Sequence, residues 1–175
     1  MSFVVAFGVS EILAGWGRQF LERDRVRPYP LQLFASFLLL ILLLQSLWGY
    51  WNFRDVHWTF PRFVAALAPL LVLSSVTFLI TPSLRGNAEV VVRDHYLGTR
   101  RVVFLLLAAC VALGTVAEVI VADPRLHVGQ AIRGVAVVLF CWLAVTRNEG
   151  VHWAVLCLLL VLQAVFIGFI TPELE

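Results

Sequence analysis

The chain has 175 residues, of which 61% are hydrophobic and 14% are charged, and its mean hydropathy is +0.92. Since a soluble domain has about 25% charged residues, this composition excludes an ordinary water-soluble fold and predicts an integral membrane protein. The formal net charge is only +2, and no polybasic run with interleaved aromatic residues occurs, so a nucleic-acid partner is not expected.

Six segments are long and apolar enough for membrane helices, each of which needs about 20 mostly apolar residues. The first contains Glu11 and the fifth contains Arg133, and such charges are unusual inside a membrane. The chain is therefore predicted to be an all-α membrane protein with six transmembrane helices. The predicted spans are residues 2–21, 31–51, 61–80, 102–122, 129–146 and 151–171.

The arginines are distributed unequally between the two sides of this topology. All 13 basic residues are arginine, and nine of them lie in or next to the first, third and fifth connections, counting Arg18 in the last turn of the first span. The positive-inside rule places these connections in the cytoplasm and both chain termini outside.

Two short sequences recur in the same order in the two halves of the chain. Val56-His57-Trp58 recurs at 151–153, and Ile80-Thr81-Pro82 recurs at 170–172. We divide the chain into a first three-helix repeat at 1–84, a connecting cytoplasmic loop at 85–101 and a second repeat at 102–175. Because three spans is an odd number, the second repeat would be inverted, as in many transporters. The alternative is coincidence among apolar segments with similar ends.

Glu11 is the leading candidate for chemistry. Gly8, Glu11, Gly15 and Arg18 recur at spacings of three or four, so they share one small, polar helix face, which belongs against another helix or a pore rather than lipid. Glu11 has no basic residue at the matching place in the second span. Arg18 is two turns away, and we expect it to reach Glu11 only through water.

Glu118 has a plausible partner in Arg133, which lies at similar depth across the predicted hairpin. An ion pair and a role in transport are both open for these two residues. Gln45 and Gln163 lie inside the second and sixth spans, where glutamine usually forms hydrogen bonds between helices. Transport or ion-path candidates are therefore Glu11, Arg18, Gln45, Glu118, Arg133 and Gln163.

His57 and His152 lie in the two Val-His-Trp sequences. Inverted repeats would place them on opposite faces of the membrane, which argues against one haem or metal bound by both. We expect His57, Trp58, His152 and Trp153 to be interfacial anchors.

The third connection is the longest and has room for a short interfacial helix or strand. It contains Asp94, His95, Arg100 and Arg101, which are candidates for a headgroup or anion site, although a membrane-surface turn with flanking positive charge is more common. We find no catalytic motif and predict no enzyme activity, cofactor or metal. Cys110, Cys141 and Cys157 are isolated in apolar runs and are best explained as small hydrophobic residues.

The segments "FRDVHWTFPRFVAALAPLL" and "DHYLGTRRVVFLLLA" resemble an uncharacterised family of short bacterial multi-pass membrane proteins, over much of residues 3–120. The resemblance implies a bacterial inner-membrane protein and adds no catalytic residue. We expect a channel or transporter for protons or a small solute, with Glu11 and Glu118 in the path. The alternative is a non-transporting accessory or scaffold subunit of a larger membrane complex, or a lipid-binding membrane protein. The expected partners are the lipid bilayer and either further copies of the chain or a larger complex.

Overall fold

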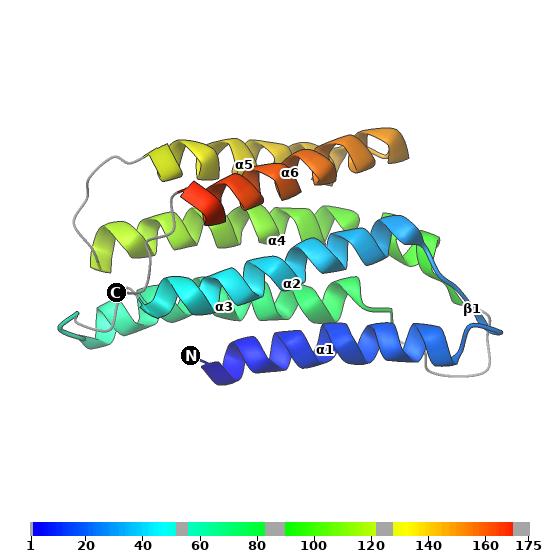
Figure 1. Cartoon of the computed structure of the whole chain (residues 1–175), viewed down its shortest axis with the longest axis horizontal. Coiled ribbons are helices and arrows are strands. Elements are labelled where there is room, and N and C mark those ends of the chain that lie inside the picture. The colour runs from blue at the N-terminus through cyan, green and yellow to red at the C-terminus, as the bar shows by residue number, and fades with distance from the viewer. Residues whose placement is uncertain (1, 52–55, 83–89, 122–127, 170–175) are drawn as a thin grey trace.

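The computed structural model describes residues 2–51, 56–82, 90–121 and 128–169. Six helices and two short strands make up these residues (Figure 1). In chain order the elements are α1 (Ser2–Leu21), β1 (Val26–Arg27), α2 (Pro30–Trp51), α3 (Phe60–Ile80), β2 (Val90–Val91), α4 (Val92–Val121), α5 (Val128–Val145) and α6 (Glu149–Phe169).

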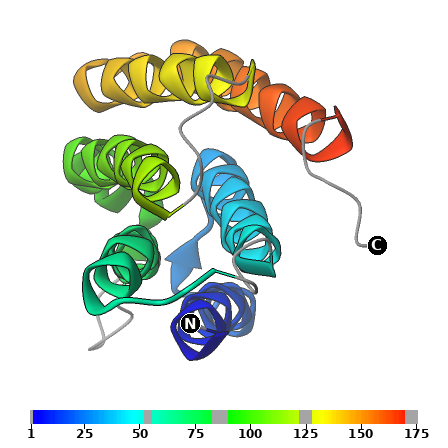
Figure 2. The same ribbon diagram turned by 90° about the vertical axis from the view of Figure 1, so that its left-hand side faces the viewer.

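The helices lie side by side and run in alternating directions (Figure 1). Seen end on, they form three layers of two helices, with α5 and α6 in one outer layer, α4 and α2 in the middle, and α3 and α1 in the other outer layer (Figure 2). The main interfaces agree with these layers, because α4 packs against both α3 and α5, and α1 packs against α3 and α2. Two helices, α1 and α5, therefore lie at opposite edges of the bundle.

Four helices are long and apolar enough to cross a membrane: α2, α3, α4 and α6. The apolar part of α5, Gln130–Val145, is shorter, and α1 carries Glu11 and Arg18 within its 20 residues. Many large apolar side chains point away from the bundle, including Phe78 on α3 and Val138 on α5. Exposed side chains of this kind suit a lipid environment, and the fold is consistent with an all-helical, multi-pass membrane protein.

The start of α4 differs from the prediction. We expected a loop up to residue 101, but α4 begins at Val92, and its first turns are packed through the buried side chains of Val92 and Tyr96. Just before it, β2 pairs in parallel with β1, which joins the first and third connections. The proposed connecting loop is therefore helical from residue 92; its residues 85–89 lie outside the described part of the chain.

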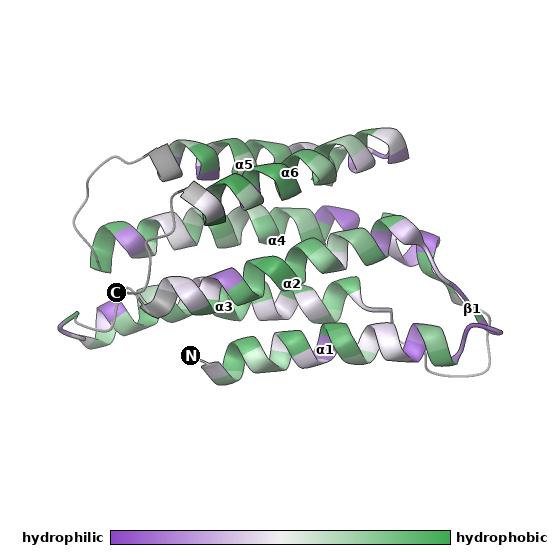
Figure 3. Ribbon diagram, in the orientation of Figure 1, coloured by the Kyte–Doolittle hydropathy of each residue, from purple (hydrophilic) through white to green (hydrophobic). Residues whose placement is uncertain are grey.

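Arginine occurs at the end of α1, in and before β1, in the first turns of α4 and between α5 and α6. These segments lie at one end of the bundle (Figure 1), where the ribbon carries hydrophilic stretches (Figure 3). We call this the arginine-rich end. The described arginines there are Arg18, Arg23, Arg25, Arg27, Arg93, Arg100, Arg101 and Arg147. Elsewhere in the described residues only Arg62 and Arg133 occur, so the strong charge asymmetry read from the sequence is also spatial.

The contacts between the two sequence halves are not those of a simple two-fold arrangement. A two-fold axis relating α1–α3 to α4–α6 would match the α3–α4 interface with one between α6 and α1, whereas α6 packs mainly against α5 and α2. The second Ile-Thr-Pro sequence, at 170–172, lies outside the described residues.

Candidate functional site at the α1–α3 interface

Two glycines allow α1 to approach its neighbours closely. A Cβ atom on Gly15 would lie 2.5 Å from Cγ2 of Thr81, and one on Gly8 would lie 3.1 Å from Cδ1 of Leu43. Both distances are shorter than ordinary carbon–carbon contacts of about 3.5–4.0 Å. The glycine-bearing face of α1 thus lies against α2 and the end of α3, where the spacing in the sequence predicts a helix contact.

Polar groups of α3 line the same interface. The hydroxyl of Ser74 donates to the carbonyl of Val4 at 2.9 Å and so joins α3 to α1. The hydroxyls of Thr77 and Thr81 donate to carbonyls one turn earlier, those of Ser74 at 2.7 Å and Thr77 at 2.8 Å. Ser74, Thr77 and Thr81 are all buried.

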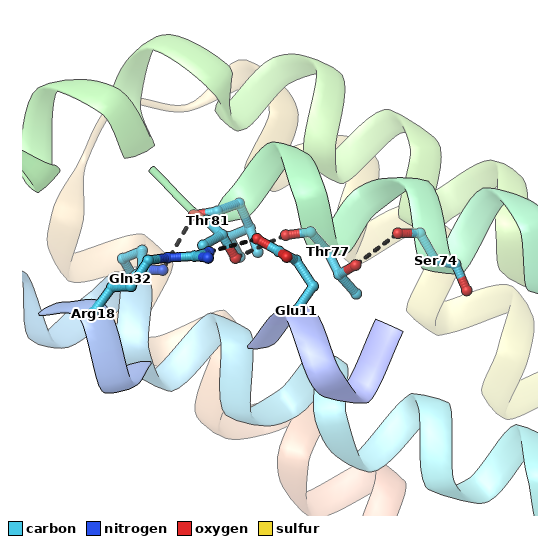
Figure 4. Close-up of polar contacts among 7 residues, drawn as sticks. Glu11, Arg18, Gln32, Ser74, Thr77 and Thr81 are labelled. Atoms are coloured by element: carbon cyan, nitrogen blue, oxygen red, sulfur yellow. Dashed lines mark hydrogen bonds and ion pairs between the residues drawn. The ribbon is translucent and has the colours of Figure 1, made fainter. Parts of the chain in front are cut away.

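Glu11 and Arg18 lie over these hydroxyls from the α1 side (Figure 4). The Arg18 guanidinium donates to Oε1 of Glu11 at 2.7 Å in an ion pair. The expectation that Arg18 reaches Glu11 only through water is therefore wrong. Both side chains are long and extend toward each other along one helix face, so together they cover two turns of helix.

Two glutamines complete the interface near the arginine-rich end. The Gln32 amide on α2 donates to the carbonyl of Ile80 at 3.1 Å, and the Gln19 amide on α1 approaches Oε1 of Gln32 at 3.4 Å. Gln19 is 3% exposed, yet its Oε1 has no hydrogen-bond partner among the described residues. Such an atom usually binds an ordered water or a ligand.

We call this interface the polar seam and define it by Glu11, Arg18, Gln19, Gln32, Ser74, Thr77 and Thr81. It runs along α1 from the level of Val4 to Gln19, which corresponds to about 22 Å at the rise of an α-helix. This length is a large part of a hydrocarbon core of about 30 Å.

Sequence reasoning missed Gln19 and Gln32. Each lies two residues from the end of its helix, on either side of the first connection. Two residues equally distant from the turn of an antiparallel pair lie at the same depth. The reasoning that paired Glu118 with Arg133 would also have paired these glutamines.

Glu118 and Arg133 form an ion pair between α4 and α5. The ion-pair alternative is therefore the one that the geometry supports. The guanidinium of Arg133 also lies 5.4 Å from the ring centroid of Phe166 on α6, within the range of a cation–π contact. Both charged side chains are about one-third exposed, so their contribution to stability is modest.

We expect the double variant Glu118→Gln/Arg133→Gln to lose less free energy of unfolding than the sum of the losses in the two single variants. Each single change leaves one charge without its partner, whereas the double change removes both charges. A double-mutant cycle of thermal unfolding in detergent should give a coupling energy of about 0.5–1 kcal/mol. Simple additivity would show that the pair contributes nothing.

Gln45 and Gln163 are hydrogen-bonded to each other and join α2 to α6. The six transport candidates therefore form three separate pairs: Glu11 with Arg18 within α1, Glu118 with Arg133 between α4 and α5, and Gln45 with Gln163 between α2 and α6. Only the first pair belongs to the polar seam.

The two Val-His-Trp histidines have opposite environments. His57 is exposed, and its carbonyl accepts a hydrogen bond from Arg62 at 3.1 Å. His152 differs from the expectation, because it is 0% exposed and its Nδ1 lies 2.8 Å from the hydroxyl of Tyr96. The Tyr96 side chain that encloses it comes from α4, which no local pattern around His152 could indicate.

The tryptophans of these two sequences, Trp58 and Trp153, are both partly exposed. The ring of Trp153 also packs against that of Phe34 on α2, with centroids 5.4 Å apart.

The candidate headgroup residues are only partly available for an external anion. His95 lies 3.0 Å from the carbonyl of Leu79, and Arg100 donates to the carbonyl of Thr146 at 3.0 Å. Asp94 and Arg101 are exposed on the surface of α4.

An exposed ion pair lies nearby between Arg93 on α4 and Glu149 on α6, at 2.6 Å. The hydroxyl of Tyr29 is buried beside this pair, close to the Glu149 carboxylate. Burial, followed by the nearby Glu149 carboxylate, raises the pKa of Tyr29 above its ordinary value.

Within the described ranges, no group of three or more His, Cys, Asp or Glu side chains could hold a metal ion. Comparison with protein-family models, with curated proteins and with solved structures finds no match to the chain.

Proposed function

We propose that the protein conducts protons or a small polar solute across a membrane along the polar seam between α1 and α3. One observation carries this proposal. Among the described residues, seven polar side chains are buried, and five of them belong to the polar seam: Gln19, Gln32, Ser74, Thr77 and Thr81. A polar group in the hydrocarbon core is costly. Several such groups gathered in one interface therefore favour a path for a proton or solute over scattered packing contacts.

The chemistry of the seam suits proton movement. Glu11 is the group in it that can take up and release a proton, and Arg18 neutralises its charge in the resting arrangement. The hydroxyls of Thr77 and Thr81 each retain lone pairs that can accept from water. The unpartnered Gln19 Oε1 supplies an acceptor at the arginine-rich end.

The proposal includes a topology. All six helices cross the membrane, the arginine-rich end lies in the cytoplasm, and both termini lie outside, in agreement with the positive-inside rule. The membrane is the bacterial inner membrane. The two halves derive from a 3+3 inverted repeat whose copies have since diverged in packing, with the Val-His-Trp and Ile-Thr-Pro sequences as its remaining marks.

Proton flux into proteoliposomes tests this function. Wild-type protein should dissipate an imposed pH gradient faster than empty vesicles, and Glu11→Gln should reduce that flux at least tenfold because it removes the only carboxylate of the seam. Glu118→Gln is the matched control and should retain most of the flux. Wild-type flux equal to that of empty vesicles, or equal flux in Glu11→Gln and wild type, would reject the proton path.

The second candidate is a non-transporting scaffold or accessory subunit, assembled with further copies or with a larger complex. Both intramembrane carboxylates are paired with arginine, and the seam hydroxyls bond to helix carbonyls, which is also how polar residues hold membrane helices together. Absence of flux, combined with co-purification in a stable larger complex, would favour this function.

A further inference from the structure

The junction of α4 and α5 at the arginine-rich end is held in place by Arg100. Its Nε donates to the carbonyl of Thr146, just after the end of α5, at 3.0 Å, and its Nη1 donates to the carbonyl of Leu97. Cations are favoured at the C-terminal end of a helix, where carbonyls lack partners. His152 lies 3.3 Å from the same Thr146 carbonyl. The backbone from which Arg147 extends is therefore fixed by α4 and α6.

Arg101 and Arg147 project from this junction. Arg101 follows Arg100 on α4, and Arg147 follows Thr146, so the contact between Arg100 and Thr146 brings the two to one level of the bundle. Both side chains are exposed and carry no ion pair to a described residue, unlike Arg93, which is paired with Glu149.

Apolar side chains are exposed within about one turn of each arginine, toward the middle of the bundle. On α4 these are Val102 and Leu105, and on α5 they are Trp142, which is 55% exposed, and Val145, which is 76% exposed. Charge beside exposed apolar and indole side chains is the pattern found where headgroups meet acyl chains. The hydropathy colours show the same change along the helices (Figure 3).

We propose that Arg101 and Arg147 bind the phosphate of an anionic glycerophospholipid whose acyl chains lie along the exposed faces of α4 and α5. Guanidinium groups are well suited to phosphate because they donate two parallel hydrogen bonds. The adjoining apolar surface selects a lipid over free phosphate. A zwitterionic lipid is disfavoured because its own cation neutralises the phosphate. This inference holds whether or not the polar seam conducts.

Thermal unfolding in nanodiscs of defined composition tests the proposal. The wild type is compared in phosphatidylcholine alone and with a rising fraction of phosphatidylglycerol. Its unfolding midpoint should rise with the anionic lipid. In Arg101→Gln/Arg147→Gln the affinity for phosphatidylglycerol should fall roughly 25-fold, about fivefold per arginine. The same fractions of phosphatidylglycerol should therefore raise the unfolding midpoint of this variant much less than that of the wild type.

The double variant Arg23→Gln/Arg62→Gln removes the same charge away from the junction and should respond like the wild type. Inorganic phosphate added to phosphatidylcholine nanodiscs should not reproduce the shift. The proposal is overturned if phosphatidylglycerol leaves the wild type unchanged, if both double variants respond alike, or if inorganic phosphate gives the full shift.

Discussion

Replacing Gly15 by leucine is expected to separate α1 from α3 and to lower the free energy of unfolding by about 1–3 kcal/mol. Even a Cβ atom at this position would lie 2.5 Å from Cγ2 and 3.2 Å from Oγ1 of Thr81. Thr81 cannot easily move away, because its hydroxyl is bonded to the carbonyl of Thr77 and the residue is buried. The larger side chain must therefore displace α1.

Gly17 is the matched control, because it lies on the same helix and a Cβ there would meet nothing within 4 Å. Gly17→Leu should unfold at or slightly above the wild-type temperature, since leucine is the better helix former. The measurement is thermal unfolding followed by tryptophan fluorescence in one detergent. Equal loss in the two variants would show that α1 is not held by close packing at Gly15.

The second large effect is expected at His152. Replacing it by alanine should cost about 2–4 kcal/mol, because the change leaves the buried Tyr96 hydroxyl without its partner and opens a cavity. The ring of Phe104 also loses a neighbour whose centroid lies 5.5 Å away.

The first Val-His-Trp sequence supplies the control for this prediction. His57→Ala changes the same residue in the same local sequence, but His57 is exposed, so the cost should stay within about 0.5 kcal/mol. Similar unfolding temperatures for the two variants would contradict the buried position of His152.

Most helix ends could be predicted because apolar runs stop where proline and arginine begin. The six expected segments coincide with helices α1 to α6, four of which are long and apolar enough to cross a membrane, and five of the six begin within about two residues of the expected position. The exception is α4, whose first turns contain Arg93, Asp94, Arg100 and Arg101 and therefore look like a loop. Val92 and Tyr96 are four residues apart and both buried, which is the spacing of one face of a helix. The charged residues around them made this spacing easy to overlook.

Contacts between particular residues of different helices were predictable only where a short connection fixes how the two helices lie alongside each other. Glu118 and Arg133 flank one connection, so their depth follows from counting residues. The pairing of β1 with β2 joins segments more than 60 residues apart, and two-residue strands leave no periodic pattern. The burial of His152 depends on Tyr96 of another helix. Sequence reasoning assigned the two histidines one role because their neighbours in the chain are alike.

Access of water to the polar seam is the most direct test of the proposed function. The three native cysteines are first removed. Single cysteines are then introduced at Ser74 or Thr81 in the seam, and at Phe78, whose side chain on α3 faces outward. Proteoliposomes are treated with a small charged thiol reagent. If the seam is a hydrated path, Ser74→Cys and Thr81→Cys should be modified much faster than Phe78→Cys. Seam cysteines that react no faster than Phe78→Cys would contradict the path and leave the seam as packing between helices.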